Sequence, residues 1–216
     1  MNVLITGGTS GIGAGIAEGF RQAGAQVTAV GMPEFDVTSQ ESIDRVMAEI
    51  DTLDALVNCA GIIQRDAEFE IETFQHVIDV NLNGTMRMCL AAKQKLMASG
   101  GSIVNLASML SFFGGPRVPA YTASKGAIAQ LTRSLAVAWA KDGIRVNAVA
   151  PGWIRTPLTQ ALQDDAERSA PIIARTPMNR WGSPEDIAGP VLFLCSKAAQ
   201  FVTGVVLPVD GGYSIS

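Results

Sequence analysis

The sequence predicts an α/β fold in which helices cover both faces of a doubly wound parallel sheet. Short, β-branched, apolar runs alternate with helix-length amphipathic patterns along the chain, which is the order expected of βαβ units. Several runs are apolar at nearly every position, as in strands that are covered on both faces. Of the 216 residues, 48% are hydrophobic. One core is therefore expected, and residues 1–216 are predicted to form a single domain.

The elements follow from the periodicity in chain order. The predicted strands are residues 2–6, 26–30, 54–58, 102–107, 145–150 and 204–209. Helical patterns lie between them, at about residues 12–24, 40–51, 71–98, 120–141 and 184–196. Residues 151–183 are proline-rich and lack periodicity, so they are predicted to form an irregular substrate loop over the carboxyl edge of the sheet, where ligands bind in such folds.

Composition excludes several classes of function. A net charge of -4 and a pI near 5.0 give no basic surface for nucleic acid or for an anionic membrane. Cys59, Cys89 and Cys195 are widely spaced, which indicates neither a disulfide framework nor a zinc site. The first residues lack the basic segment of a signal peptide, and the uncharged stretch 98–116 is broken by Gly, Ser and Asn. We therefore expect a cytoplasmic protein without membrane spans.

A glycine-rich turn, TGGTSGIG at residues 6–13, follows the first strand and leads into a helix. Glycines let the backbone approach a pyrophosphate, and the free N–H groups of a helix start attract its charge. A tight turn alone can also require glycine, but the position of this one in a βαβ unit favours a Rossmann-type dinucleotide site. The candidate cofactor contacts are Gly7, Thr9, Ser10, Gly11, Ile12 and Gly13.

The tip of the second strand bears on the choice of cofactor. Residues 30–33, VGMP, carry no carboxylate to hold an adenosine ribose, and the nearest acids are Glu34 and Asp36. No Arg or Lys lies between Arg21 and Arg45 to hold a ribose phosphate. We expect NAD, with NADP possible.

Tyr121 and Lys125 lie one helical turn apart on the same face. A cation about 4 Å from a phenol contributes about 4 kcal/mol at an effective dielectric constant of 20, or about three pKa units. We therefore expect the pKa of Tyr121 to fall close to neutral pH, where a proton-transfer group works best. Ser108 ends a strand-like run and could polarise a carbonyl, and Asn81 is an unexpected amide inside a helical pattern.

These residues give the chain a resemblance to the short-chain dehydrogenase/reductase family over essentially its whole length. The turn resembles the family's TGxxxGIG, residues 58–61 resemble its NNAG, and residues 151–156 resemble its PGxxxT. Asn81, Ser108 and the pair Tyr121 and Lys125 match its asparagine, serine and YxxxK. The resemblance implies further cofactor contacts at Asp36, Val37, Asn58, Ala60, Gly61, Tyr121, Lys125, Pro151, Gly152, Ile154 and Thr156.

The implied reaction is hydride transfer between a secondary alcohol or ketone and a nicotinamide, with no metal. Tyr121 would move the hydroxyl proton, Lys125 would lower its pKa and hold the nicotinamide ribose, and Ser108 would orient the carbonyl. Asn81 would position a water linking Lys125 to solvent. The family usually assembles as tetramers, so a homo-oligomer, dimer or tetramer, is expected.

The chain departs from the family pattern beyond the second strand. Only Gly31 to Phe35 separate Val30 from Asp36, where the family places a helix and a third strand. Because a parallel neighbour needs a crossover of about a dozen residues or more, we predict a sheet shortened at that edge. Cys59 also replaces the second asparagine of NNAG and is expected to be a small buried residue rather than a reactive thiol.

Local segments narrow the substrate. Residues 61–66, 105–125 and 179–186 resemble the sugar-acid members of the family, the keto-deoxy-gluconate and gluconate dehydrogenases. A sugar acid or polyol is therefore expected. A carboxylate would need a fixed cation, for which Arg117 is the first candidate and Arg65 and Arg155 follow. Arg117 could equally be a solvated loop residue.

The sequence is also compatible with two other functions. A 3-oxoacyl-[acyl-carrier-protein] reductase shares the general motifs. A non-catalytic dinucleotide-binding regulatory protein would fit the shortened adenosine side, although the four matched catalytic positions disfavour it. A Ser-His-Asp hydrolase is not supported, because His76 is the only histidine, is expected on a solvent-facing helix surface, and has no GxSxG motif beside it.

Overall fold

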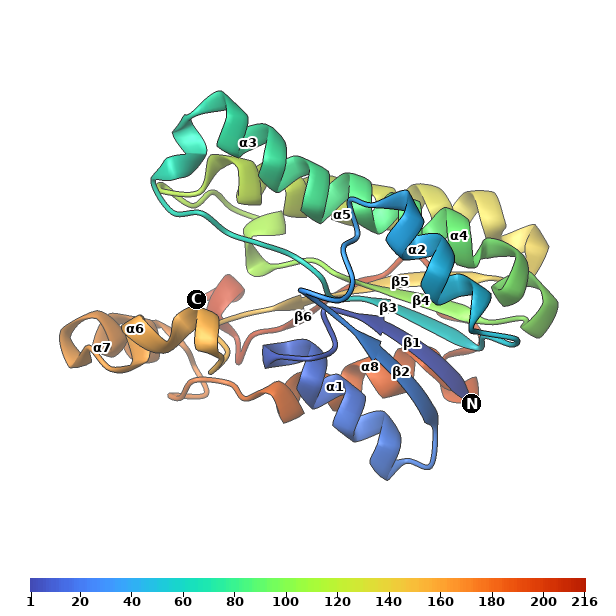
Figure 1. The fold of residues 1–216 in the computed structure, drawn as a ribbon. Helices are drawn as coiled ribbons and strands as arrows, with labels where there is room; N and C mark the ends of the chain where they lie inside the picture. Colours follow the sequence, from blue (N-terminus) through green and yellow to red (C-terminus); the bar gives the residue numbers. More distant parts are fainter.

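The computed structural model describes residues 1–216 and contains one six-stranded parallel sheet with the order β2-β1-β3-β4-β5-β6 (Figure 1). The strands are β1 (Asn2–Thr6), β2 (Gln26–Val30), β3 (Ala55–Asn58), β4 (Ser102–Leu106), β5 (Arg145–Pro151) and β6 (Val206–Val209). The strand order reverses between β1 and β3. Ligands of such sheets bind beside the carboxyl ends of the strands at this reversal.

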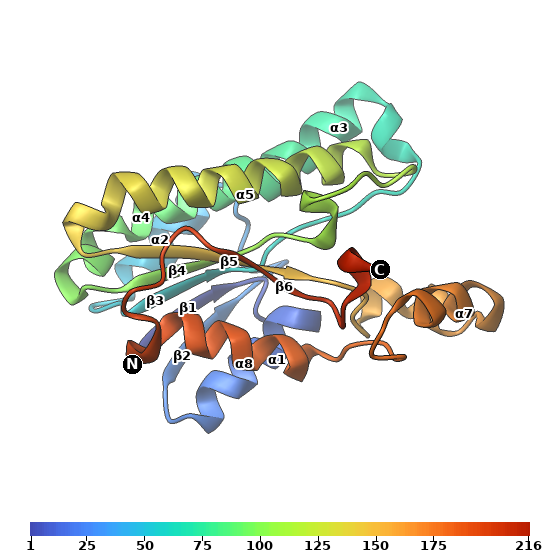
Figure 2. The same cartoon turned by 180° about the vertical axis from the view of Figure 1, so that it is seen from behind.

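Helices cover both faces of the sheet, as Figures 1 and 2 show from opposite sides. One face is covered by α1 (Gly11–Gln22) and α8 (Pro184–Cys195), and the other by α2 (Gln40–Ala48), α4 (Gly84–Ser99) and α5 (Pro119–Trp139). Side chains of β1 alternate between the two cores, since Val3 and Ile5 pack toward α1 and α8 while Leu4 packs toward α2 and α4. The doubly wound fold expected from the periodicity is confirmed.

The edge beyond β2 is short, as expected. No helix or strand lies between Val30 and Gln40, so β2 is the edge strand of the sheet. The connecting loop places Phe35 and Val37 in the core beneath α2 and α4. These two apolar side chains anchor the loop in the place of a longer connection.

Two helical assignments differ from the expectation. The single helix expected at residues 71–98 is α3 (Ile71–Ile78), a π-helical turn (Asp79–Asn83) and α4, so Asn81 occupies a widened turn of the kind often found at functional sites. His76 is exposed, as expected.

The loop 151–183 is more helical than expected. It contains α6 (Gln160–Gln163) and α7 (Ala166–Arg175), and α7 includes Pro171. The Asp165 carboxylate caps α7 by accepting bonds from the N–H groups of Glu167 and Arg168. The prolines of this segment are the reason that the sequence pattern did not predict α7. No helix in the molecule combines the length and apolarity needed to cross a membrane.

Candidate active site

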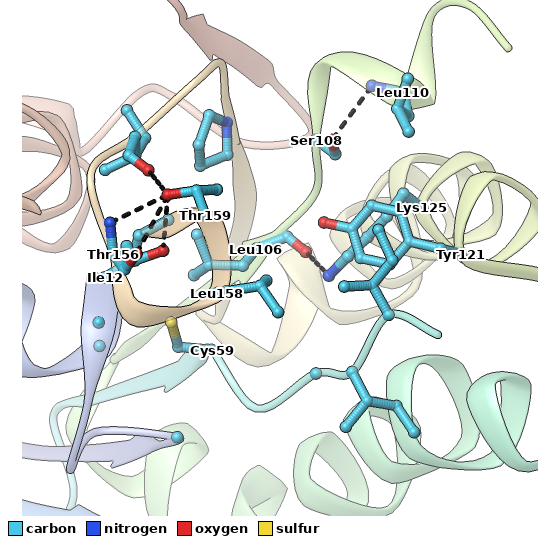
Figure 3. Close-up of a pocket in the computed structure, with 18 of the residues that line it drawn as sticks. Ile12, Cys59, Leu106, Ser108, Leu110, Tyr121, Lys125, Thr156, Leu158 and Thr159 are labelled. Carbon is cyan, nitrogen blue, oxygen red and sulfur yellow. Dashed lines mark hydrogen bonds between the residues drawn. The ribbon is translucent and has the colours of Figure 1, made fainter. Parts of the chain in front are cut away.

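A cavity of about 370 Å³ opens at the carboxyl edge of the sheet (Figure 3). Its walls come from the glycine turn, the segment after β3, the end of β4, the start of α5 and the segment after β5. The cavity brings together the following sequence-predicted residues: Gly7, Ser10, Gly11, Ile12, Gly13, Ala60, Gly61, Ser108, Tyr121, Lys125, Pro151, Gly152, Ile154 and Thr156. Segments far apart in the chain therefore converge on one space.

The glycine turn is packed so closely that side chains cannot be accommodated. Gly7 has a φ of 63°, and a Cβ there would lie 2.8 Å from the backbone of Ala60. A Cβ on Gly13 would lie 2.1 Å from the carbonyl oxygen of Gly7. Helix α1 begins at Gly11, and the N-cap Ser10 makes no side-chain bond to its first turn. The N–H groups of this turn and of the start of α1 thus form a backbone cradle that suits the diphosphate of a dinucleotide.

Tyr121, Lys125 and Ser108 meet on the opposite wall. The hydroxyl of Tyr121 points into the cavity (Figure 3). The ammonium of Lys125 lies 5.5 Å from the centre of the Tyr121 ring and donates a 2.6 Å hydrogen bond to the carbonyl of Leu106. Ser108 accepts a hydrogen bond from the N–H of Leu110 at 3.1 Å, which leaves its own O–H free to donate. These groups can together bind and protonate a carbonyl oxygen.

The protonation states differ from the sequence-based expectation. Burial raises the pKa of the Tyr121 phenol, against a lowering by the Ser108 hydroxyl and the Arg65 cation. The expectation of a phenol pKa near neutral was therefore wrong, because Lys125 bonds to Leu106 and burial outweighs the neighbouring cations. Burial also lowers the pKa of Lys125 to about 8. At neutral pH the site holds a neutral phenol beside a mostly protonated amine.

Asn81 does not line the cavity but holds its wall. Its Oδ1 accepts from the N–H of Ile62 at 2.8 Å, and its Nδ2 donates to the carbonyl of Ile62 at 2.9 Å and to Ser124 at 3.1 Å. A Cβ on Gly61 would lie 3.3 Å from the Asn81 amide oxygen and 3.7 Å from the Lys125 nitrogen. The π-helical turn thus aims the amide at the loop that crosses in front of Lys125.

The side where the sequence places the adenosine is less enclosed. Thr9, Asp36 and Val37 lie outside the cavity, and their cofactor contacts stay predictions. The Asp36 carboxylate accepts two 2.8 Å bonds from Thr38. A Cβ on Gly31 would lie 2.4 Å from the Thr9 hydroxyl, so a larger residue at this position would require Thr9 to move.

Asn58 does not line the cavity, and its cofactor contact stays a prediction. Its side chain is buried and donates to the amide oxygen of Asn105 at 2.9 Å and to the sulfur of Cys89 at 3.3 Å. Asn105 in turn donates to Thr132 at 3.0 Å. The amide therefore ties β3 to β4 and to α5 inside the core.

The structure reverses the order of the candidate arginines. Arg117 forms an exposed ion pair with Asp66 and does not line the cavity, and Arg155 is exposed outside it. Arg65 lines the cavity, is half-buried and makes no ion pair. The position of Arg117 before Tyr121 in the sequence did not reveal its partner, Asp66, and this pairing favours Arg65 over Arg117 as the cation that faces the cavity.

Sequence reasoning missed Glu68, a buried carboxylate behind the cavity wall. An acid in a polar stretch gives no pattern that predicts burial. Cys59 lines the cavity, and burial raises its pKa to about 12, so the thiol is held neutral. No group of three or more His, Cys, Asp or Glu side chains is arranged to hold a metal ion.

Comparison with known proteins agrees with this geometry. Residues 30–214 match a family model described as Enoyl-(Acyl carrier protein) reductase. The chain is 41% identical to the 2-dehydro-3-deoxy-D-gluconate 5-dehydrogenase of Escherichia coli K12 over 97% of this chain and 94% of that protein. That alignment spans 237 residues, more than the 216 of this chain, so the relative carries residues that this chain lacks.

Solved structures give the same result. A candidate NAD(P)-dependent gluconate 5-dehydrogenase from Beutenbergia cavernae, with NADP bound at low occupancy, superimposes with a TM-score of 0.94 at 42% identity, covering 100% of this chain and 97% of that one. A gluconate 5-dehydrogenase from Burkholderia cenocepacia in complex with NADP and tartrate gives a TM-score of 0.89 at 34% identity, covering 100% and 95%. The chain belongs to the short-chain dehydrogenase/reductase family and is an NAD(P)-dependent oxidoreductase.

Proposed function

We propose that the protein interconverts a secondary alcohol and a ketone on a sugar acid. The observation that carries this proposal is that Arg65, which makes no ion pair, lines the same cavity as Tyr121. A half-buried, unpaired cation favours an anionic substrate, and Arg binds a carboxylate in bidentate fashion. The relatives named for gluconate and 2-dehydro-3-deoxy-D-gluconate support the same substrate class.

The roles of the residues follow from their positions. The nicotinamide, when bound, supplies the hydride for ketone reduction and accepts it in alcohol oxidation. Ser108 donates a hydrogen bond to the carbonyl oxygen, and Tyr121 gives that oxygen its proton. Lys125 keeps a positive charge beside the phenol, and Arg65 holds the carboxylate. Residues 151–183 form the substrate loop, since 151–154 and 156–159 line the cavity.

Replacing Arg65 tests the substrate class. Arg65→Ala removes a charged hydrogen bond, a loss of about 1.5–3 kcal/mol, and we expect the KM for a hexonate to rise at least about tenfold. The KM for the dinucleotide should change less than about twofold, because the glycine turn is untouched. Arg155→Ala is the matched control, since Arg155 lies outside the cavity. Equal KM values for hexonate in Arg65→Ala and Arg155→Ala would contradict the proposal.

Acyl thioester reduction is the second candidate, favoured by the description of the matching family model. It would not require the Arg65 cation to face the substrate. Turnover of a 3-oxoacyl thioester with NADPH, at a kcat/KM above that for any sugar acid, would support this alternative instead.

We also propose that copies of the chain associate. Val137 on α5, Leu90 on α4 and Phe201 near β6 are 82%, 55% and 101% exposed. Exposed apolar side chains on α4, on α5 and near β6 fit a homo-oligomer better than an isolated chain. A cytoplasmic location fits the three free cysteines.

A further inference from the structure

Glu68 is a buried carboxylate that has no role in the reaction proposed above. It lies in the 3-10 turn Ala67–Phe69, and only 1% of its surface is exposed. Burying a carboxylate is costly unless hydrogen bonds satisfy its charge. Glu68 makes no ion pair, so its charge is satisfied by other groups.

Its two oxygens join two walls of the active site. Oε1 accepts from the backbone N–H of Gln64 at 2.8 Å, and Oε2 accepts from the backbone N–H of Tyr121 at 2.8 Å. Tyr121 lies in the first turn of α5, where N–H groups lack intrahelical acceptors and the helix dipole favours a negative charge. The carboxylate therefore ties the segment that carries Arg65 to the helical turn that carries Tyr121.

A second tie lies beside it at the surface. Asp66 adopts a φ of 67°, which is unusual for a residue other than glycine, and its carboxylate pairs with Arg117. Its N–H also donates to the carbonyl of Arg117 at 2.9 Å. Exposed ion pairs of this kind contribute little, so the buried carboxylate of Glu68 is the side chain that fixes this segment to the first turn of α5.

Glu68 also acts on the phenol through its charge. The groups that face Tyr121 from the surrounding elements are Ser108, Lys125, Arg65, Cys59 and Glu68 itself. The Glu68 carboxylate raises the pKa of the phenol, whereas the Arg65 cation lowers it. Loss of the Glu68 charge would remove one of the influences that raise the phenol pKa, while burial, the largest of them, would remain.

We propose that Glu68 is a positioning residue that, by bonding to both segments, sets the distance between the cation at Arg65 and the proton donor at Tyr121. This inference rests on the proposed function, in which Arg65 binds the substrate carboxylate and Tyr121 transfers the proton. The two groups must hold opposite ends of one substrate, so a fixed spacing between them selects its length.

Two variants separate the spacing from the charge. Glu68→Gln removes the charge and one of the two acceptors, and Glu68→Asp keeps the charge but is one methylene too short to reach both N–H groups. Glu70→Gln is the control, because Glu70 is exposed and makes no side-chain bond at the start of α3. The measurements are the pH profile of kcat for sugar-acid oxidation and the dinucleotide affinity, followed by tryptophan fluorescence.

We expect both Glu68 variants to lower kcat at least about tenfold, with dinucleotide affinity within about twofold of the parent. In Glu68→Gln the rising limb of the profile should move to lower pH, because the Glu68 carboxylate raises the pKa of the Tyr121 phenol. In Glu68→Asp the rising limb of the pH profile should stay at the parental pH. Glu70→Gln should match the parent in the pH profile of kcat and in dinucleotide affinity.

A Glu68→Gln variant with the kcat and pH profile of Glu70→Gln would overturn the inference. If Glu68→Gln does not fold, Glu68→Asp decides alone, and parental kcat in that variant would overturn it. The variant Tyr121→Phe distinguishes a failure of the proposed function from a failure of the role proposed for Glu68. Turnover in Tyr121→Phe would contradict the proposed function itself, whereas an inactive Tyr121→Phe beside a normal Glu68→Gln would contradict only the role of Glu68.

Discussion

At the end of the site that holds Tyr121 and Lys125, side chains from β4, α5 and the segments after β3 and β5 enclose one cavity. At the other end, where the adenosine is expected, a short loop, residues 31–35, lies beside an open sheet edge. The groups at the enclosed end are held by buried bonds, such as those of Asn81 to Ile62 and of Lys125 to Leu106. At the open end, Asp36 bonds mainly to its neighbour Thr38.

This difference shows which parts of the fold the chemistry depends on. No catalytic candidate is attached to β2 or to the loop after it, so a helix and a strand can be missing there without disturbing Tyr121 or Lys125. Phe35 and Val37 close the core that a longer connection would otherwise cover. The enclosed end should therefore dominate catalysis, and the open end should mainly tune affinity for the cofactor.

The largest effect should come from Tyr121→Phe. This change removes the proton donor and leaves the ring in place, so we expect kcat to fall by about 100-fold to 10,000-fold. Dinucleotide affinity should be nearly unchanged. Steady-state kinetics with a hexonate and fluorescence titration with the dinucleotide check both parts, and parental kcat would refute the assignment of the donor.

Next in size is Gly13→Ala. The added Cβ would lie 2.1 Å from the Gly7 carbonyl, so the turn must open, and we expect dinucleotide affinity to fall by about tenfold or more. Gly189→Ala in α8 is the control, since a Cβ there meets no atom within 4 Å. The control should bind normally and gain about 0.5–1 kcal/mol of stability. Equal affinities in the two variants would argue against the diphosphate cradle.

A pH-dependent stability change should follow Lys125→Met. The folded pKa of Lys125 is lowered from 10.5 to about 8, so between these pH values the unfolded chain binds more protons than the folded one. Burial of the Lys125 ammonium therefore lowers the free energy of unfolding by up to about 3 kcal/mol below pH 8. This loss of stability disappears as the pH rises toward 10.5. In denaturant unfolding, the variant should have a higher free energy of unfolding than the parent at pH 7, and this difference should become smaller at alkaline pH. A gap independent of pH would contradict the buried ammonium.

The smallest effect should be that of Asp36→Ala at the open end. Asp36 lies outside the cavity, so we expect less than about tenfold loss of dinucleotide affinity and no change in kcat. Titrations with NAD and NADP in parallel test this. A loss larger than that of Gly13→Ala would mean that the open end, not the enclosed end, carries the binding.

Much of this arrangement could be predicted from the sequence, because glycine turns, strand alternation and helix periodicity are local properties. The glycine turn, the pair Tyr121 and Lys125, and the missing elements after Val30 all follow from spacing along the chain. The π-helical turn at Asn81 and the helix through Pro171 do not, since both depend on contacts and caps that composition does not reveal.

Electrostatics was the least predictable part. The sequence places Lys125 near Tyr121 but cannot say that the ammonium bonds to Leu106 or that burial governs the phenol. It likewise cannot distinguish Arg117, which Asp66 neutralises, from Arg65, which faces the cavity alone. Both outcomes depend on partners that are distant in the chain.

Single-turnover mixing of the parent protein, reduced or oxidised nicotinamide cofactor and a panel of sugar acids tests the central claim most directly. We predict that the nicotinamide absorbance changes in one fast phase with at least one sugar acid, and that this phase disappears in Tyr121→Phe. Tight dinucleotide binding without a hydride-transfer phase for any alcohol or ketone of the panel would contradict the account.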